Sequence, residues 1–69
     1  MEKALAKRIK ALLDDRGIKY AHLGRKIGLD DGQISRMLSG NKRICTGDIP
    51  EICRVIGVSP NELFDINEP

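Results

Sequence analysis

The chain has 69 residues, the length of a single domain, which we place at residues 1–69. Apolar residues make up 41% of it, but with one Phe, one Tyr and no Trp the small core must be aliphatic. The net charge of +2 is unevenly placed, because residues 1–43 hold eleven of the twelve basic residues and only five of the ten acidic ones. This imbalance favours a polyanionic partner on one side of the molecule, although a solvated helix surface would give the same count.

Residues 2–16 are predicted to form the first helix, which Gly17 can end. Its apolar stripe consists of Leu5, Ile9, Leu12 and Leu13. The basic residues off this stripe are Lys3, Lys7, Arg8 and Lys10. We expect them in solvent, within reach of phosphates. The segment does not have the pattern of a signal peptide, and no apolar run is long enough to cross a membrane, so we expect a cytoplasmic protein with no membrane partner.

Residues 18–40 have the pattern of two short helices joined by a tight turn, at about 20–27 and 31–38. Apolar residues recur one helical turn apart, at Leu23 and Ile27 in the first helix and at Ile34 and Leu38 in the second. In the turn, Gly28 suits a left-handed helix end, Leu29 fills the corner, and Asp30 can cap the second helix. A unit of this kind, here about 19–39, lets its second helix project into a DNA groove.

Two further helices are predicted in the acidic C-terminal part. Asp48 and Glu51 have the spacing of a capping box with Pro50 in the first turn, and Gly57 ends that helix. Its buried stripe is Ile49, Ile52, Cys53 and Ile56. Ser59 caps the last short helix, whose apolar residues are Leu63, Phe64 and Ile66. With no strand pattern or repeat, the fold class is all-α with five helices.

The residue types needed for catalysis or metal binding are scarce. Cys45, Cys53 and His22 are too few for a zinc site, and no C-x-x-C occurs. We expect both thiols reduced, Cys53 in the core and Cys45 in a loop, and His22 on the surface. No nucleophile–base pair or phosphate-binding glycine loop is evident, so we predict no enzyme, metal, cofactor or small-molecule substrate.

The chain contains several short motifs, none of which is specific by itself. The spacing between them, taken together, is specific. The motifs are Leu23-Gly24, Ile27-Gly28-Leu29, Ile34, Met37, Gly40, Ile56-Gly57-Val58-Ser59 and Glu62-Leu63. Over 5–64 the chain therefore resembles the phage-repressor and Cro-like, or XRE-type, helix-turn-helix family. The resemblance implies a compact five-helix, lambda-repressor-like domain that binds double-stranded DNA, usually as a homodimer on a near-palindromic operator.

The resemblance also implies roles for single residues, with helix 31–38 in the major groove. The base-contacting candidates are Asp31, Gly32, Gln33 and Arg36. Arg36 can bond bidentately to guanine and Gln33 to adenine. The phosphate-contacting candidates are Lys19, Tyr20, Asn41, Lys42 and Arg43. For Tyr20 two interpretations stay open: its hydroxyl donates to phosphate, or its ring only covers Ile18 and helix 31–38.

Some residues depart from the family pattern. Asp31 places a carboxylate where phosphates repel it, unless it accepts from cytosine N4 or stays in solvent. Gly32 has no side chain and weakens its helix, although it allows close backbone approach. Leu38 and Gly24 stand where the family commonly has glutamate and alanine. These departures indicate a modest direct readout of sequence.

We therefore expect a small transcriptional regulator, most often a repressor, in the bacterial cytoplasm or nucleoid, with a phage or prophage as one source of the gene. One recognition helix reads only about four or five base pairs, so a dimer is expected. Leu63, Phe64 and Ile66 are the candidate dimer interface, although they could equally complete the core. The alternative is an antitoxin or protein-interaction adaptor that reuses the fold, against which the basic N-terminal half argues.

Overall fold

Five α-helices and one short 3-10 helix make up the computed structural model, which describes residues 2–64. They are α1 (Glu2–Arg16), α2 (Tyr20–Ile27), α3 (Asp31–Leu38), η1 (Thr46–Asp48), α4 (Ile49–Ile56) and α5 (Pro60–Leu63). No strand occurs in the described part of the chain. The predicted all-α, five-helix fold is confirmed.

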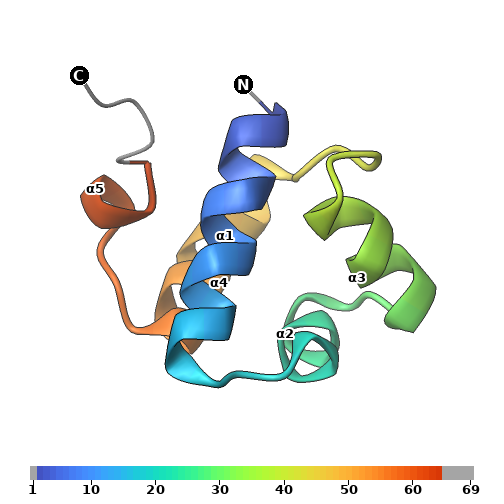
Figure 1. Ribbon diagram of the computed structural model, residues 1–69, viewed down its shortest axis with the longest axis horizontal. Coiled ribbons are helices and arrows are strands. Elements are labelled where there is room, and N and C mark those ends of the chain that lie inside the picture. The colour runs from blue at the N-terminus through green and yellow to red at the C-terminus, as the bar shows by residue number, and fades with distance from the viewer. Residues whose placement is uncertain (1, 65–69) are drawn as a thin grey trace.

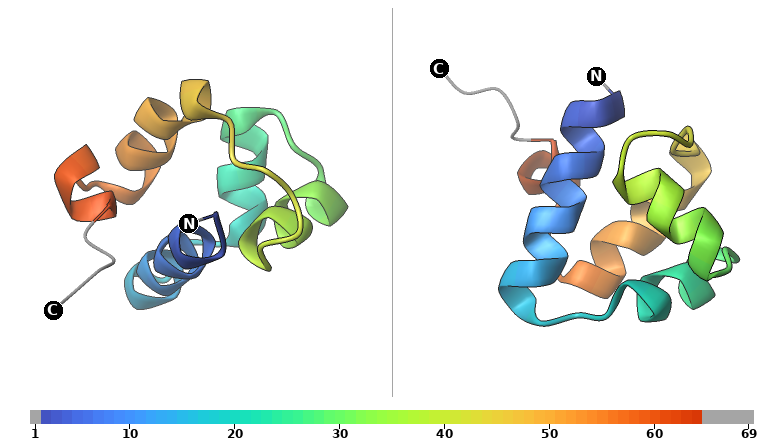
Figure 2. Two further views of the ribbon diagram at one scale, coloured as in Figure 1. Left: turned by 90° about the horizontal axis from the view of Figure 1, so that it is seen from above. Right: turned by 45° about the vertical axis from the view of Figure 1, so that its right-hand side comes forward.

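Helix α1 lies at the centre and front of the view in Figure 1, and the other helices form an arc behind it and to both sides (Figures 1 and 2). The helix-turn-helix pair α2 and α3 lies on one side, and α4 and α5 lie behind α1 and on its other side. Helix α4 also packs against α2, so the pair is held by both α1 and α4.

The core is aliphatic, as the composition predicts, and it draws on all five α-helices. Its buried residues are Leu5, Ala6, Ile9, Leu12, Leu13, Leu23, Ile34, Met37, Leu38, Ile44, Ile52, Cys53, Ile56, Val58 and Leu63. No buried polar or charged residue is found among the described residues. Cys53 lies in this core and burial raises the pKa of its thiol, whereas Cys45 is exposed.

Two of the three predicted side-chain caps form. The backbone N–H of Gln33 donates to Asp30 Oδ1 over 2.8 Å, and the backbone N–H of Glu62 donates to Ser59 Oγ over 3.2 Å. In both cases the side chain three residues on accepts from the capping residue's own N–H over 3.0 Å, which completes a capping box. The starts of α3 and α5 are therefore fixed by local sequence.

The capping box predicted for α4 is wrong. Asp48 makes no side-chain cap, because it ends η1 in a helical conformation (φ −89°, ψ −11°) instead of the extended conformation of an N-cap. Glu51, its expected partner, pairs with Arg54 instead. The predicted bounds of α4 hold, with Pro50 in its first turn and Gly57 (φ 87°) at its left-handed end.

Two arginines of α1 hold the C-terminal helices. The expectation that Arg8 lies in solvent is wrong: it is half-buried, and its Nε and Nη2 donate to the Glu62 carbonyl over 3.2 and 2.9 Å. Arg16 Nη1 donates to the Ile56 carbonyl over 2.8 Å. Both guanidiniums bond carbonyls at helix ends, which lack partners within their own helix. These contacts attach α5 and the end of α4 to α1.

Candidate nucleic-acid interface

The turn between α2 and α3 brings the two helices into close contact at Gly24. The Leu29 N–H donates to the Gly24 carbonyl over 2.7 Å, and Gly28 takes the left-handed conformation (φ 80°). A Cβ atom at Gly24 would lie 2.9 Å from the Leu29 carbonyl oxygen and 3.3 Å from Ile34 Cβ. Gly24 is therefore required where the family commonly has alanine, because the backbone of the turn occupies the space of a side chain.

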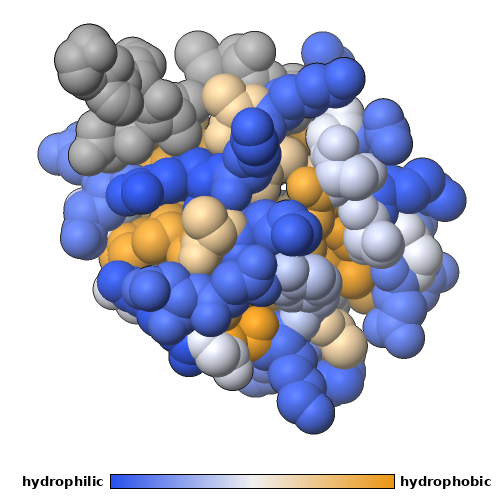
Figure 3. All heavy atoms as spheres, in the orientation of Figure 1, coloured by the Kyte–Doolittle hydropathy of each residue, from blue (hydrophilic) through white to orange (hydrophobic). Residues whose placement is uncertain are grey.

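Helix α3 buries one face and exposes the other. Ile34, Met37 and Leu38 lie in the core. The exposed residues are Asp31, Gly32, Ser35 and Arg36. The side of the molecule on which α3 lies is mostly hydrophilic (Figure 3). The structure thus presents an outward-facing polar surface on a helix held by apolar packing, as the sequence predicts.

The base-contacting candidates differ in how free their side chains are. Arg36 is exposed, and its guanidinium bonds to none of the described residues. Asp31 is exposed in the first turn of α3, where a carboxylate is stabilised by the helix dipole. Gln33 is half-buried, and its Oε1 accepts from the Asp30 N–H in the capping box. Arg36 is therefore the most available side chain of the four candidates, and Gly32 offers only backbone.

The N-terminus of α2 is left open. Lys19 occupies the N-cap position in an extended conformation, is exposed, and makes no side-chain cap. The first turn holds no acidic residue. Backbone N–H groups at such a terminus are suited to bind an anion, and Lys19 adds a positive charge beside them.

Tyr20, the first residue of α2, is bonded to α1. It is half-buried against the core, and its hydroxyl donates to Asp14 Oδ1 over 2.6 Å. Lys10 Nζ lies 3.8 Å from Asp14 Oδ2. The hydrogen bond to Asp14 raises the pKa of Tyr20 above its ordinary value. The hydroxyl thus has a partner within the chain that neither interpretation of Tyr20 included.

The loop after α3 carries the remaining phosphate-contacting candidates. The Asn41 N–H donates to the Arg36 carbonyl over 2.8 Å, which seats this loop on the end of α3. Arg43 is exposed and Lys42 is half-buried. Lys3 of α1 packs over Gly40 at the start of the loop, where a Cβ atom would lie 2.7 Å from Lys3 Cγ. One basic residue of α1 is therefore brought to the loop that follows α3.

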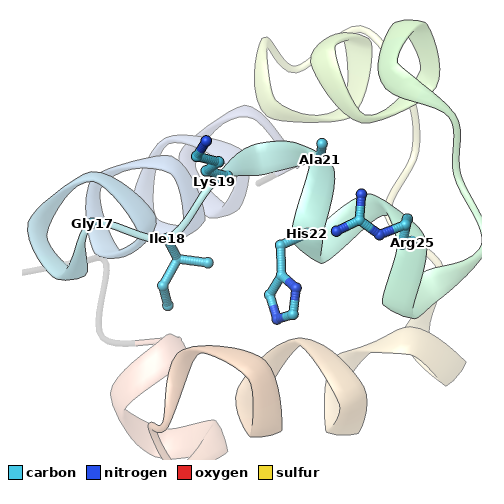
Figure 4. Close-up of a pocket in the computed structure, with 6 residues that line it drawn as sticks. All are labelled: Gly17, Ile18, Lys19, Ala21, His22 and Arg25. Atoms are coloured by element: carbon cyan, nitrogen blue, oxygen red, sulfur yellow. The ribbon is translucent and has the colours of Figure 1, made fainter.

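A hollow lies beside the start of α2, lined by Gly17, Ile18, Lys19, Ala21, His22 and Arg25 (Figure 4). The side chains of Ile18 and His22 extend toward α4, whereas Lys19 points to the other side of α2. The basic side chains do not converge on one point in this hollow. His22 is exposed, where the sequence places it.

The residues of the candidate dimer interface separate in the structure. Leu63 is fully buried in the core of the protomer, so its side chain is assigned to the core and not to a surface. Phe64 is 46% exposed and is the large exposed hydrophobic residue of the described chain. Ile66 lies outside the described residues. An interface at this end of the molecule would therefore be centred on Phe64.

The described residues contain no group of three or more His, Cys, Asp or Glu side chains placed to hold a metal ion. Among the helices of residues 2–64, none combines the length and the apolar character needed to span a bilayer.

The close α2–α3 corner and the exposed polar face of α3 define a helix-turn-helix domain. A family model described as the Cro/C1-type HTH DNA-binding domain matches residues 8–69, and the chain belongs to that family. Neither the curated proteins nor the solved structures contain a match to the chain. Members of this family are DNA-binding regulators and are typically not enzymes.

Proposed function

We propose that this protein is a sequence-specific transcriptional repressor that binds a near-palindromic operator as a homodimer, with α3 in the major groove. The observation that carries the proposal is the exposed Arg36 guanidinium on the outer face of a helix whose other face is buried. Arg36 would bond guanine O6 and N7 bidentately. In this proposal the protein acts by binding alone, in a bacterial cytoplasm or nucleoid, and a phage or prophage origin fits its family.

Basic groups stand at both ends of the helix-turn-helix unit, which supports the assignment of phosphate contacts. Lys19 precedes α2 beside an uncapped helix terminus, and Lys42 and Arg43 follow α3. Contacts of this kind fix the position of a protein on a duplex but carry little sequence information. Asn41 is proposed to contact the backbone from the same loop, and Tyr20 only if its hydroxyl exchanges Asp14 for a phosphate.

A homodimer is proposed because one helix of eight residues reads too few base pairs for useful specificity. Two recognition helices about 34 Å apart would read successive major grooves on one face of DNA. The exposed ring of Phe64 supports an interface near α5, in which each copy would present the same patch to the other.

The proposal is tested with fluorescently labelled duplexes, first a random-sequence duplex and then a site selected from a random library. The logarithm of the association constant should fall with log salt, with a slope of about −0.9 per phosphate contacted. Arg36→Ala should weaken binding to the selected site by roughly tenfold or more, the range of one bidentate base contact. Lys42→Ala should weaken both duplexes about equally.

The matched control is Arg54→Ala, which removes one positive charge from α4, where Arg54 pairs with Glu51. It should leave both affinities almost unchanged. Binding that does not depend on salt would contradict DNA as the partner and favour a protein-interaction module. Equal effects of Arg36→Ala and Lys42→Ala would show that α3 is not the helix that reads bases.

A further inference from the structure

The amide of Gln33 has a fixed orientation in the capping box of α3. The Asp30 backbone N–H can only donate, so the Gln33 atom that lies 3.0 Å from it must be the acceptor Oε1. The backbone N–H of Gln33 in turn donates to Asp30 Oδ1 over 2.8 Å. Because the two bonds close one ring at the helix terminus, the side chain cannot turn its amide over without losing the first of them.

The remaining polar group of this side chain is Nε2, which carries two hydrogens and no lone pair to offer. It makes no hydrogen bond with the described residues. Gln33 is half-buried, and the preceding Gly32 is exposed and has no side chain that could cover it. Gln33 and Arg36 are three positions apart, so they are neighbours on the surface of α3.

Base pairs differ in the groups that would meet such a donor. In the major groove guanine presents two acceptors, N7 and O6, and thymine presents the acceptor O4. Adenine presents one acceptor, N7, beside the amino donor N6, and cytosine presents only the amino donor N4. The bidentate contact of glutamine with adenine needs Oε1 to accept from N6 while Nε2 donates to N7. In this chain one lone pair of Oε1 already accepts from the Asp30 N–H, which holds this oxygen against the helix terminus, and moving it away would leave the Asp30 N–H without its partner.

We infer that Gln33 reads bases through its Nε2 donor and favours a keto base, guanine or thymine, over adenine, which offers a single acceptor beside an amino donor, and over cytosine, which offers no acceptor. This inference rests on the proposed function, because it concerns the sequence that α3 would read. Arg36 carries donors alone, so the two neighbouring side chains favour keto bases together. The operator half-site would therefore hold guanine or thymine at the position that glutamine alone would assign to adenine.

The decisive variant is Gln33→Glu, which keeps the capping box and replaces the Nε2 donor by a carboxylate oxygen, which is an acceptor. Glutamate at this position is a standard capping-box partner, because one carboxylate oxygen accepts from the N-cap N–H. Its other oxygen accepts where Nε2 donated, so it matches the amino groups of cytosine or adenine. Thermal unfolding followed by circular dichroism should show Gln33→Glu to be as stable as the wild type.

Selection from a random duplex library is carried out with the wild type, Gln33→Glu and Gln33→Ala. In the wild-type site one position should favour a keto base by about two- to tenfold, the range of one neutral hydrogen bond. That position should change to cytosine or adenine with Gln33→Glu and lose its preference with Gln33→Ala. Preferences are compared between bases in one library, so a general loss of affinity from the added charge cancels.

Three results would overturn the inference. An adenine enriched above guanine and thymine at the position that changes in Gln33→Glu would overturn the inference, because that preference requires Oε1 as well as Nε2 to bond the base. A selected site that is identical for the wild type and Gln33→Glu would show that Gln33 reads no base, while the proposed function stands. A library from which the wild type enriches no sequence would overturn the proposed function, and this inference with it.

Discussion

Helices α2 and α3 both have eight residues, yet their N-termini are built in opposite ways. Helix α3 begins with a complete capping box, so its first amide groups are partly used by its own side chains. Helix α2 begins at Tyr20, after the N-cap residue Lys19, with no side-chain cap and no acidic residue in its first turn. In the proposed complex this difference would suit two tasks: the open backbone amides of α2 would bind phosphate, and α3, whose terminus is closed, would meet bases through its side chains.

Each of the two helices contains one glycine, Gly24 in α2 and Gly32 in α3, and only Gly24 lies where a side chain would clash. Substitutions at these two positions give the largest expected change in the free energy of unfolding. A Cβ atom at Gly24 would meet the backbone carbonyl of Leu29 at 2.9 Å, whereas at Gly32 it would meet only Asp30 Oδ1 at 3.6 Å. Overpacking costs about 1–3 kcal/mol, and contact with a rigid backbone carbonyl places Gly24→Ala toward the upper end of this range, above the roughly 1 kcal/mol that alanine gains over glycine in a helix. Gly24→Ala should therefore destabilise the protein, and Gly32→Ala should stabilise it, in urea unfolding. Equal gains from both changes would show that the corner of the helix pair relaxes freely.

Exchanging the two kinds of terminus should produce smaller changes of opposite sign. Asp30→Ala removes the cap of α3 and should cost about 1 kcal/mol of unfolding free energy. Lys19→Asp supplies a cap to α2 and should add up to about 1 kcal/mol, but it should weaken DNA binding, because a carboxylate would occupy the amides proposed to bind phosphate.

The controls for this exchange are single changes at matched positions. Asp31→Ala removes an exposed carboxylate that caps nothing, so its effect should be smaller than that of Asp30→Ala. Lys19→Ser supplies an uncharged cap and separates capping from charge reversal. Unchanged DNA affinity in Lys19→Asp would contradict a phosphate contact at the start of α2.

The smallest expected effect concerns the hydrogen bond from the Tyr20 hydroxyl to Asp14, which attaches the uncapped start of α2 to α1. Tyr20 is the single tyrosine of the chain, so its ionisation can be followed by ultraviolet absorbance. Its pKa should lie above the ordinary value of 10.0, because the hydroxyl donates to Asp14. Since a raised pKa stabilises the fold below the unfolded value, this contribution is present below about pH 10 and is lost as pH rises through the folded pKa.

Two variants of α1 should move this pKa in opposite directions. Asp14→Ala should bring it back toward 10.0, and Lys10→Ala should raise it further, because the lysine lowers it in the native protein. A pKa that does not respond to Asp14→Ala would show that the tyrosine is not bonded to α1 in solution.

The sequence was sufficient to predict all five helices, because their ends are set by local chemistry. Gly28 and Gly57 occupy left-handed helix ends, and Asp30 and Ser59 supply caps, each within a few residues of the helix it bounds. The same reasoning failed at Asp48, which has the spacing of a cap. The last residues of the loop between α3 and α4 form the 3-10 helix η1, and no local sequence pattern predicts this helix.

The side-chain partners were less predictable than the helices. Arg8 and Arg16 bond backbone carbonyls 54 and 40 positions away, and every residue type offers such a carbonyl. For the adjacent Leu63 and Phe64, a four-residue helix does not determine which one faces the core. At Gln33 two uses of one amide were compatible with the sequence, namely closing a capping box and reading a base, and only the geometry shows the first.

The bond between Arg8 and the Glu62 carbonyl also bears on how the chain becomes a folded protein. Synthesis delivers the N-terminal residues first, so a growing polypeptide already holds α1, α2 and α3 before the group that anchors α5 exists. Leu63, a fully buried residue, is added directly afterwards. The contacts between α5 and α1 can therefore form only after residues 62 and 63 have been added, and a chain truncated before Glu62 lacks them.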